Sequence, residues 1–179
     1  MTVILVSGAP GTGKSTVAAA VGAALDLPLL SLDPVKEALA DVLGTGDEAW
    51  SDRLGDAAAE LLFRLAPTFP AVVVEGWWRG ARRERAIEVF AGAVEVFCRC
   101  DPELVARRMR ARHGAGRHPI HRDMINPALI DAMPSSSARV TPLALGAGLV
   151  VADTDRPDAA QLAVEQVRAV LAARPVTGR

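Results

Sequence analysis

The sequence predicts an α/β fold in which helices cover both faces of a five-stranded parallel sheet. Short apolar runs alternate along the chain with longer segments that carry apolar residues at helical spacing, and this alternation is typical of parallel sheets. A glycine-rich segment joins the first apolar run to the first helical segment. The chain has 179 residues and no internal repeat, so we expect residues 1–179 to form a single domain.

The composition indicates a globular protein and weighs against several other classes. Hydrophobic residues make up 50% of the chain, which argues against disorder. The formal net charge of -1 argues against a nucleic acid or a membrane surface as partner. No apolar run approaches the roughly 20 residues of a membrane helix. Because the first strand begins almost at residue 1, we expect no signal peptide and a cytoplasmic protein.

Apolar runs and turn residues define the elements in the first half of the chain. Strands are expected at residues 3–6, 29–32 and 71–74, and helices at residues 14–25, 33–43, 51–65 and 80–90. Asp33 before Pro34 is typical of a helix start, with a capping residue followed by proline at the first helical position. Pro67 and Pro70 end the third helix.

The second half of the chain is harder to interpret. Strands are expected at residues 94–100 and 149–152, and helices at residues 102–112 and 158–172. Asp101 before Pro102 caps the first of these helices. A short helix can start after Asn126, whereas the serines at residues 135–137 are typical of a loop. We expect the tail from Pro175 onward to be frayed.

The glycine-rich segment fits the pattern G-x-x-x-x-G-K-[ST] at every fixed position. It reads Gly8-Ala9-Pro10-Gly11-Thr12-Gly13-Lys14-Ser15 and lies between a strand and a helix, which is the context of a phosphate-binding loop. Glycines let backbone N–H groups converge on an anion, and the first helical turn, which includes Thr16, adds its positive dipole end. Lys14 is placed to reach the β- and γ-phosphates, and the Ser15 hydroxyl to bind Mg²⁺. The alternative is a glycine turn that merely joins strand to helix.

Carboxylates follow several of the predicted strands. Ligands of parallel sheets bind at the carboxyl ends of strands, and this rule brings the glycine-rich segment, Asp33, Glu75 and Asp101 to one edge. Asp33 could take the proton from an acceptor hydroxyl during phosphoryl transfer, or it could be a plain helix cap. Glu75 could hold Mg²⁺ or bind the substrate. Trp77 is a candidate wall of the acceptor pocket, with core packing as its alternative.

A basic segment lies near the middle of the chain. Residues 107–122 hold six arginines and all three histidines. Arg108 and Arg112 are four residues apart, so one helix face presents both, and arginines stabilise the negative charge of a γ-phosphoryl group. The polar residues 113–123 suit a mobile lid over a nucleotide, with Arg117 as a candidate substrate contact. The alternative is a solvated basic face.

Together these motifs resemble the P-loop small-molecule kinases of the nucleoside-monophosphate-kinase type. In pattern the chain is similar to the group that includes chloramphenicol phosphotransferase, zeta toxin and the kinase domain of bacteriophage polynucleotide kinase. The shared marks are the glycine-rich segment, Ser31-Leu32-Asp33, Val72-Val73-Val74-Glu75, the run from Cys98 to Leu104, Arg108, Arg112 and Gly116-Arg117-His118-Pro119. The resemblance implies the strand order 2-3-1-4-5, ATP and Mg²⁺ as cofactors, Asp33 as base, and Arg108 and Arg112 as lid arginines.

We therefore expect an ATP-dependent phosphotransferase that moves the γ-phosphate to a hydroxyl of a small molecule, such as an antibiotic or a sugar-type acceptor. One alternative is a kinase of nucleosides, nucleotides or polynucleotide 5′-hydroxyls. Another is a nucleotide-dependent switch or accessory ATPase, against which the chain has no Asn-Lys-x-Asp guanine signature. Members of the group differ in their acceptor, so the fold does not identify it.

Overall fold

The computed structural model describes residues 1–174, and the tail predicted to be frayed from Pro175 lies outside the described residues. Five parallel strands form one sheet in the order β2-β3-β1-β4-β5. This order confirms the predicted fold class. The strands are β1 (Thr2–Ser7), β2 (Leu29–Ser31), β3 (Ala71–Glu75), β4 (Val94–Arg99) and β5 (Leu149–Asp153).

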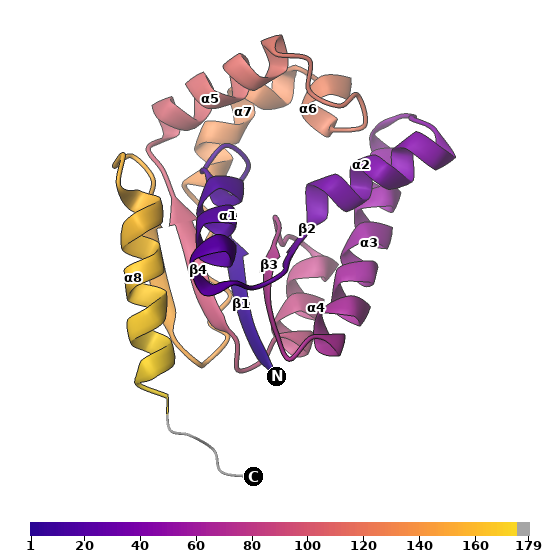
Figure 1. The fold of residues 1–179 in the computed structure, drawn as a ribbon. Helices are drawn as coiled ribbons and strands as arrows, with labels where there is room; N and C mark the ends of the chain where they lie inside the picture. Colours follow the sequence, from indigo (N-terminus) through magenta and orange to yellow (C-terminus); the bar gives the residue numbers. More distant parts are fainter. Residues whose placement is uncertain (175–179) are drawn as a thin grey trace.

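Helices cover both faces of the sheet and one of its ends. In Figure 1, α1 and α8 lie on one side of the sheet, α3 and α4 on the other, and α5, α6 and α7 cross the end where the strands finish. No described helix is both long and apolar enough to cross a bilayer. The α-helices are α1 (Lys14–Leu25), α2 (Leu32–Leu43), α3 (Glu48–Leu65), α4 (Ala81–Val89), α5 (Pro102–Gly114), α6 (Arg122–Ile125), α7 (Ala128–Ser137) and α8 (Ala159–Ala172), and a 3₁₀ helix spans Ala66–Thr68.

Strand β1 shows why a central strand of this sheet is apolar over most of its length. Successive side chains of a strand point to opposite faces of the sheet. Ile4 and Val6 belong to the core with α1 and α8, whereas Val3 and Leu5 belong to the core with α3. Because both faces are covered, alternate positions are buried equally, and the period-two pattern of a half-exposed sheet is absent from this strand.

Two helix starts differ from the sequence-based expectation. Helix α2 begins at Leu32 with Ser31 in the capping position, so the prediction that Asp33 caps it and that Pro34 takes the first helical position is wrong. A proline without an N–H fits anywhere in the first turn, where no intrahelical partner exists, and therefore does not fix the boundary. Helix α3 begins three residues earlier than expected, at Glu48, because the Asp47 side chain accepts a hydrogen bond from the Trp50 N–H.

The segment predicted as a lid contains less loop than expected. Helix α5 continues through Gly114, and α6 begins at Arg122, so the irregular part is limited to residues 115–121. The serines at residues 135–137, predicted as a loop, are the last turn of α7. Helix α7 forms because Ile130 and Met133 pack on α5, and this tertiary burial outweighs the weak helix propensity of serine.

One buried carboxylate supports the segment that precedes β5. Glu95 on β4 is 1% exposed. It accepts hydrogen bonds from the Ser7 hydroxyl at 2.6 Å and from the backbone N–H groups of Leu143 and Ala144. These donors satisfy a charge that would otherwise be costly to bury, and they fix an irregular segment to the centre of the sheet.

Candidate active site

The glycine-rich segment forms a tight loop between β1 and α1. Gly8, Gly11 and Gly13 have φ angles of 139°, 82° and 78°, which side chains rarely allow. A Cβ at Gly8 would also lie 2.5 Å from the carbonyl oxygen of Cys98, so only glycine fits there. Lys14 is 9% exposed, and its Nζ donates to the Ala9 carbonyl at 2.9 Å. The loop therefore places one buried ammonium against its own backbone at the N-terminus of α1.

An open groove lies on one side of this loop. The P-loop groove, as we call it, has a volume of about 460 Å³ and runs over Gly11–Val17 toward the segment that follows β5. Thr154, Arg156 and Pro157 of that segment line it. This position agrees with the expectation that ligands bind where parallel strands end.

Arg108 forms the border of the P-loop groove, and its guanidinium is largely used by the protein. Its Nη2 donates to the Thr154 carbonyl at 2.8 Å, and its Nη1 lies 3.1 Å from the Thr154 hydroxyl and 3.5 Å from the Gly11 carbonyl. Thr154 in turn donates to the Thr12 carbonyl at 2.9 Å. Arg108 thus ties α5 to the P-loop and to the segment after β5, and much of its donor capacity is already satisfied.

A second, more enclosed pocket lies on the other side of Lys14. The Asp33 pocket has a volume of about 140 Å³. Several of its lining side chains are apolar, and most of the others are charged. The apolar side chains include Leu32, Trp77, Met109, Leu129 and Met133. Trp77 thus lines this pocket, and its contact with an acceptor stays a prediction, whereas Trp78 is 3% exposed and belongs to the core under α3.

The carboxylate of Asp33 points into a strongly cationic environment. Burial by itself would raise its pKa, but His121, Arg117, Lys14 and Lys36 outweigh this effect and hold the pKa below its ordinary value. Its Oδ2 accepts from Arg117 at 3.1 Å. The side chain nevertheless remains half-exposed toward the pocket. An ionised carboxylate is thus available near Lys14 at neutral pH.

Glu75 and Ser15 also line the Asp33 pocket. Glu75 is 5% exposed at the end of β3, and its Oε2 accepts from the Ser31 hydroxyl at 2.6 Å. Ser15 follows Lys14 in the first turn of α1. A hydroxyl and a carboxylate are hard oxygen ligands of the kind that Mg²⁺ prefers. Asp101, by contrast, caps α5 through the N–H groups of Glu103 and Leu104 and lines neither cavity.

Arg112 belongs to both cavities. It lines the P-loop groove and the Asp33 pocket, together with Lys14 and Ser15. Its Nε and Nη2 are buried without a hydrogen-bond partner. Burial and the neighbouring Arg117 lower the pKa of this guanidinium, although an arginine keeps its charge in proteins. Arg112 is therefore a half-buried cation between the two cavities, and two of its buried donors have no hydrogen-bond partner among the described residues.

Residues 115–121 dock in the cleft between α2 and α3. Ile120 is completely buried against Ala40 and Leu54. The carbonyl of Ile120 accepts from the Ser51 hydroxyl at 2.7 Å, and the same hydroxyl accepts from the Nζ of Lys36 at 2.7 Å. The predicted lid thus contacts the helices of the Asp33 pocket, and its mobility in solution stays a prediction.

Both histidines of the docked segment contact the acidic face of α2. His118 Nε2 lies 3.2 Å from Asp41, and His121 Nε2 lies 2.6 Å from Glu37. Asp33, Glu37 and Asp41 are spaced four residues apart and therefore share one helix face. Arg117 meets the first of them and also pairs with Asp123, so this face of α2 holds the docked segment along its length.

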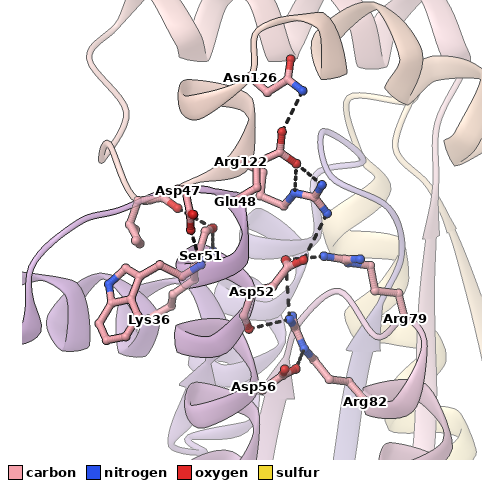
Figure 2. Close-up of polar contacts among 12 residues, drawn as sticks. Lys36, Asp47, Glu48, Ser51, Asp52, Asp56, Arg79, Arg82, Arg122 and Asn126 are labelled. Atoms are coloured by element: carbon pink, nitrogen blue, oxygen red, sulfur yellow. Dashed lines mark hydrogen bonds and ion pairs between the residues drawn. The ribbon is translucent and has the colours of Figure 1, made fainter.

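Helix α3 carries a second row of carboxylates, which we call the α3 row: Glu48, Asp52 and Asp56. Figure 2 shows arginines reaching the row from three other segments. Arg122 of α6 pairs with Glu48, and Arg82 of α4 pairs with Asp56. Arg79, which precedes α4, donates to Asp52 at 2.6 Å. Neither this row nor Lys36 was predicted as part of the site from the sequence, although the four-residue spacing of the three acids is a signal for a shared helix face.

Comparisons with known proteins place the chain among families with related folds. A family model described as an AAA domain matches residues 3–131. The shikimate kinase of Bradyrhizobium diazoefficiens is 29% identical over 111 residues, which make up 61% of this chain and 54% of that protein. The chain therefore spans about half the length of this curated relative.

Solved structures extend the likeness to nearly the whole chain. The crystal structure of a putative kinase from Chloroflexus aurantiacus is 31% identical, with a TM-score of 0.83 over 94% of this chain and 97% of that one. A shikimate kinase from Bacteroides thetaiotaomicron has a TM-score of 0.61 at 18% identity and covers 96% of this chain and 98% of its own. The latter likeness supports the fold alone.

Proposed function

The chain belongs to the AAA domain family, and from this premise we propose that it is an ATP-dependent kinase that transfers the γ-phosphoryl group to a hydroxyl of a small molecule. One observation carries the proposal: the P-loop groove and the Asp33 pocket share Lys14, Ser15 and Arg112. A nucleotide in the groove would bring its γ-phosphoryl group to this shared border. A switch or an accessory ATPase has no need of a second enclosed pocket there.

The P-loop supplies the binding of the triphosphate. Backbone N–H groups of the loop and the N-terminus of α1 attract phosphate oxygens, and Lys14 exchanges its bond to the Ala9 carbonyl for the β- and γ-phosphates. Ser15 and Glu75 are the residues that would hold Mg²⁺, which neutralises charge on the phosphates when bound. Thr154, Arg156 and Pro157 would contact the adenine ring of the nucleotide. Arg108 would form the fixed border of the groove at its adenine end.

Asp33 is the proposed base. The acceptor oxygen attacks the γ-phosphorus, the bond between this phosphorus and the β–γ bridging oxygen breaks, and ADP leaves with the bond's electrons. The hydroxyl proton passes to the Asp33 carboxylate as the new oxygen–phosphorus bond forms. Arg117, which donates to Asp33 at 3.1 Å, positions this carboxylate.

Arg112 is the proposed partner of the transferred group. During transfer, negative charge spreads over the oxygens of the γ-phosphoryl group, and a guanidinium offers several donors to them. Its unpartnered Nε and Nη2 support this role. Arg108 supports it less, because its donors already hold Thr154 and Gly11. We therefore propose that Arg112 stabilises the transferred phosphoryl group and that Arg108 maintains the shape of the groove.

The acceptor is proposed to be a small molecule of the antibiotic or sugar type, in keeping with the resemblance to chloramphenicol phosphotransferase and its relatives. A nucleic acid is the less suitable partner, because the Asp33 pocket is narrower and more enclosed than the P-loop groove. The shikimate kinase relative supports a small hydroxyl compound as the class of acceptor.

Incubation of the protein with ATP, Mg²⁺ and a library of small alcohols tests the proposal. Mass spectrometry should find one compound heavier by a phosphoryl group, with ADP formed in equal amount. The Lys14→Met variant, which keeps the length of the side chain but loses its charge, is the control and should form no product. Slow ATP hydrolysis without any phosphorylated alcohol would instead support a switch or an accessory ATPase.

A further inference from the structure

We propose that the Asp33 pocket selects an acceptor without a negative charge, and that Asp52 of the α3 row is the residue that determines this selection. The inference rests on the proposed kinase function and names the class of its acceptor as an uncharged alcohol. It differs from what a shikimate kinase relative would suggest, because shikimate is a carboxylate.

The arginines around the acceptor end of the pocket are already paired. Arg79, Arg82, Arg117 and Arg122 line the pocket, and each has a carboxylate of this chain within ion-pair distance. Recognition of an anionic acceptor usually relies on a guanidinium whose donors are free for a bidentate contact. An acceptor carboxylate would therefore have to compete with an intramolecular ion pair at each of these side chains, although the Nε of Arg79 is buried without a hydrogen-bond partner among the described residues.

Asp52 is the centre of this pairing. Its Oδ1 lies 2.6 Å from Arg79 and 4.0 Å from Arg82, and its Oδ2 lies 3.4 Å from Arg122. Three guanidinium groups from different segments therefore converge on one carboxylate, as Figure 2 shows. Asp52 itself lines the pocket. It occupies the place that the carboxylate of an acidic acceptor would take among these arginines.

The remaining cations of the pocket have other uses. Lys36 donates to Ser51, and the Asp33 carboxylate favours its ammonium form. Arg112 stands at the border with the P-loop groove, where the transferred phosphoryl group would use its donors. An anionic group at the acceptor end would instead face Asp33, Asp52 and Asp123. Burying an anion is costly unless a cation that is not already paired is available to bind it.

Matched alcohol pairs test the inference. Hydroxy acids and their carboxamides, with shikimate and its carboxamide as the first pair, are incubated with wild-type protein, ATP and Mg²⁺, and kcat/KM is measured for each member. We expect the carboxamide to be favoured at least tenfold. Preference for the acids would overturn the inference and leave the kinase function intact, whereas the absence of product from every alcohol would count against the kinase function and the inference together.

The Asp52→Asn variant tests the determinant. It keeps the size of the side chain but releases Arg79 and Arg122 from their shared carboxylate. The preference for carboxamide over acid should fall at least tenfold relative to wild type. Asp131→Asn is the matched control, since Asp131 pairs with Arg110 outside both cavities, and its preference should equal that of wild type. An unchanged preference in folded Asp52→Asn would refute the role of Asp52.

Discussion

The P-loop groove and the Asp33 pocket differ in whether their cationic side chains already have anionic partners. At the groove, Lys14 is bound only to a backbone carbonyl, and Arg112 has buried donors without partners. At the pocket, Arg79, Arg117 and Arg122 are each neutralised by carboxylates of the same chain. The first region is prepared for a ligand that brings negative charge. Apart from Lys14 and Arg112 at its border with the groove, the arginines of the second region already have carboxylate partners, so we expect this region to select its ligand by shape and hydrogen bonding.

The two regions also differ in how they are built. One side of the groove is the backbone of a short loop, whose glycines adopt angles that few other residues allow, and the other side comes from α5 and the segment after β5. The pocket depends on side chains from the seven helices α1 to α7, from β3, and from the segments before α4 and α6. A site made from one contiguous motif tolerates little change in sequence, whereas a site assembled from ion pairs can change its ligand through single substitutions.

The largest expected effect is the loss of Lys14. Lys14→Met should lower phosphoryl transfer by about 10³–10⁵-fold, on the scale of other cations that stabilise the transferred group. The melting temperature should change little, because the ammonium contacts only the Ala9 carbonyl. Product formation is measured with saturating acceptor. Wild-type rates in the folded variant would show that the groove does not bind the triphosphate and would break the contrast between the regions.

The next largest effect on phosphoryl transfer is expected from the loss of the Asp33 carboxylate. Asp33→Asn should lower transfer by about 10²–10⁴-fold, the usual contribution of a general base, with ATP affinity unchanged. Because Asp33 lies inside α2 and Ser31 holds the capping position, the variant should still fold. Transfer and nucleotide affinity are measured side by side. If transfer persists at the wild-type rate, the base lies elsewhere, with Glu75 as the next candidate.

Replacing Arg112 is expected to lower phosphoryl transfer less than replacing Asp33. Comparing Arg112 with Arg108 shows whether the two lid arginines have different roles. Arg112→Lys should lower transfer by about 10²-fold, since an ammonium keeps the charge but loses the forked donors. Arg108→Lys should mainly raise the KM for ATP, because Arg108 holds Thr154 and the P-loop backbone. Steady-state kinetics of both variants would contradict this assignment if their effects were exchanged.

The last expected effect is on stability instead of activity and comes from the buried ammonium of the pocket. Burial lowers the pKa of Lys36 to about 8, from an ordinary value of 10.5. Between these values the unfolded chain binds more protons, so raising the pH favours the folded state. The free energy of unfolding of wild type relative to Lys36→Met should rise by on the order of 3 kcal/mol across this window. Denaturant unfolding from pH 7 to pH 11 measures it, and a constant difference would contradict the shift.

The sequence supports the groove better than the pocket for a physical reason. The P-loop is contiguous, so its pattern contains the strand, the turn and the helix start together. The pocket joins distant residues: Arg122 and Glu48 are 74 positions apart. No local pattern reveals such a pair. Asp33 was predicted because the topology of parallel sheets places strand ends at one edge, whereas Lys36 and Asp52 gave no such signal.

The predicted strands were more accurate than the predicted helix boundaries. The fold class and the strand order are confirmed, because they follow from the alternation of elements along the chain and from the family resemblance. The start of α2 and the serine turn of α7 were mistaken, because proline is tolerated throughout a first turn and because packing on α5 outweighs local propensity. The catalytic roles themselves remain predictions that kinetics must test.

The position of Arg112 on both cavities has a thermodynamic consequence. A ligand that engages its guanidinium in one cavity changes what the other cavity offers, so the two binding events share a coupling free energy. Linkage requires this coupling to be reciprocal: the factor by which a nucleotide alters acceptor affinity must equal the factor by which the acceptor alters nucleotide affinity. One side chain would thereby couple the binding affinities of the two substrates without any movement of the sheet.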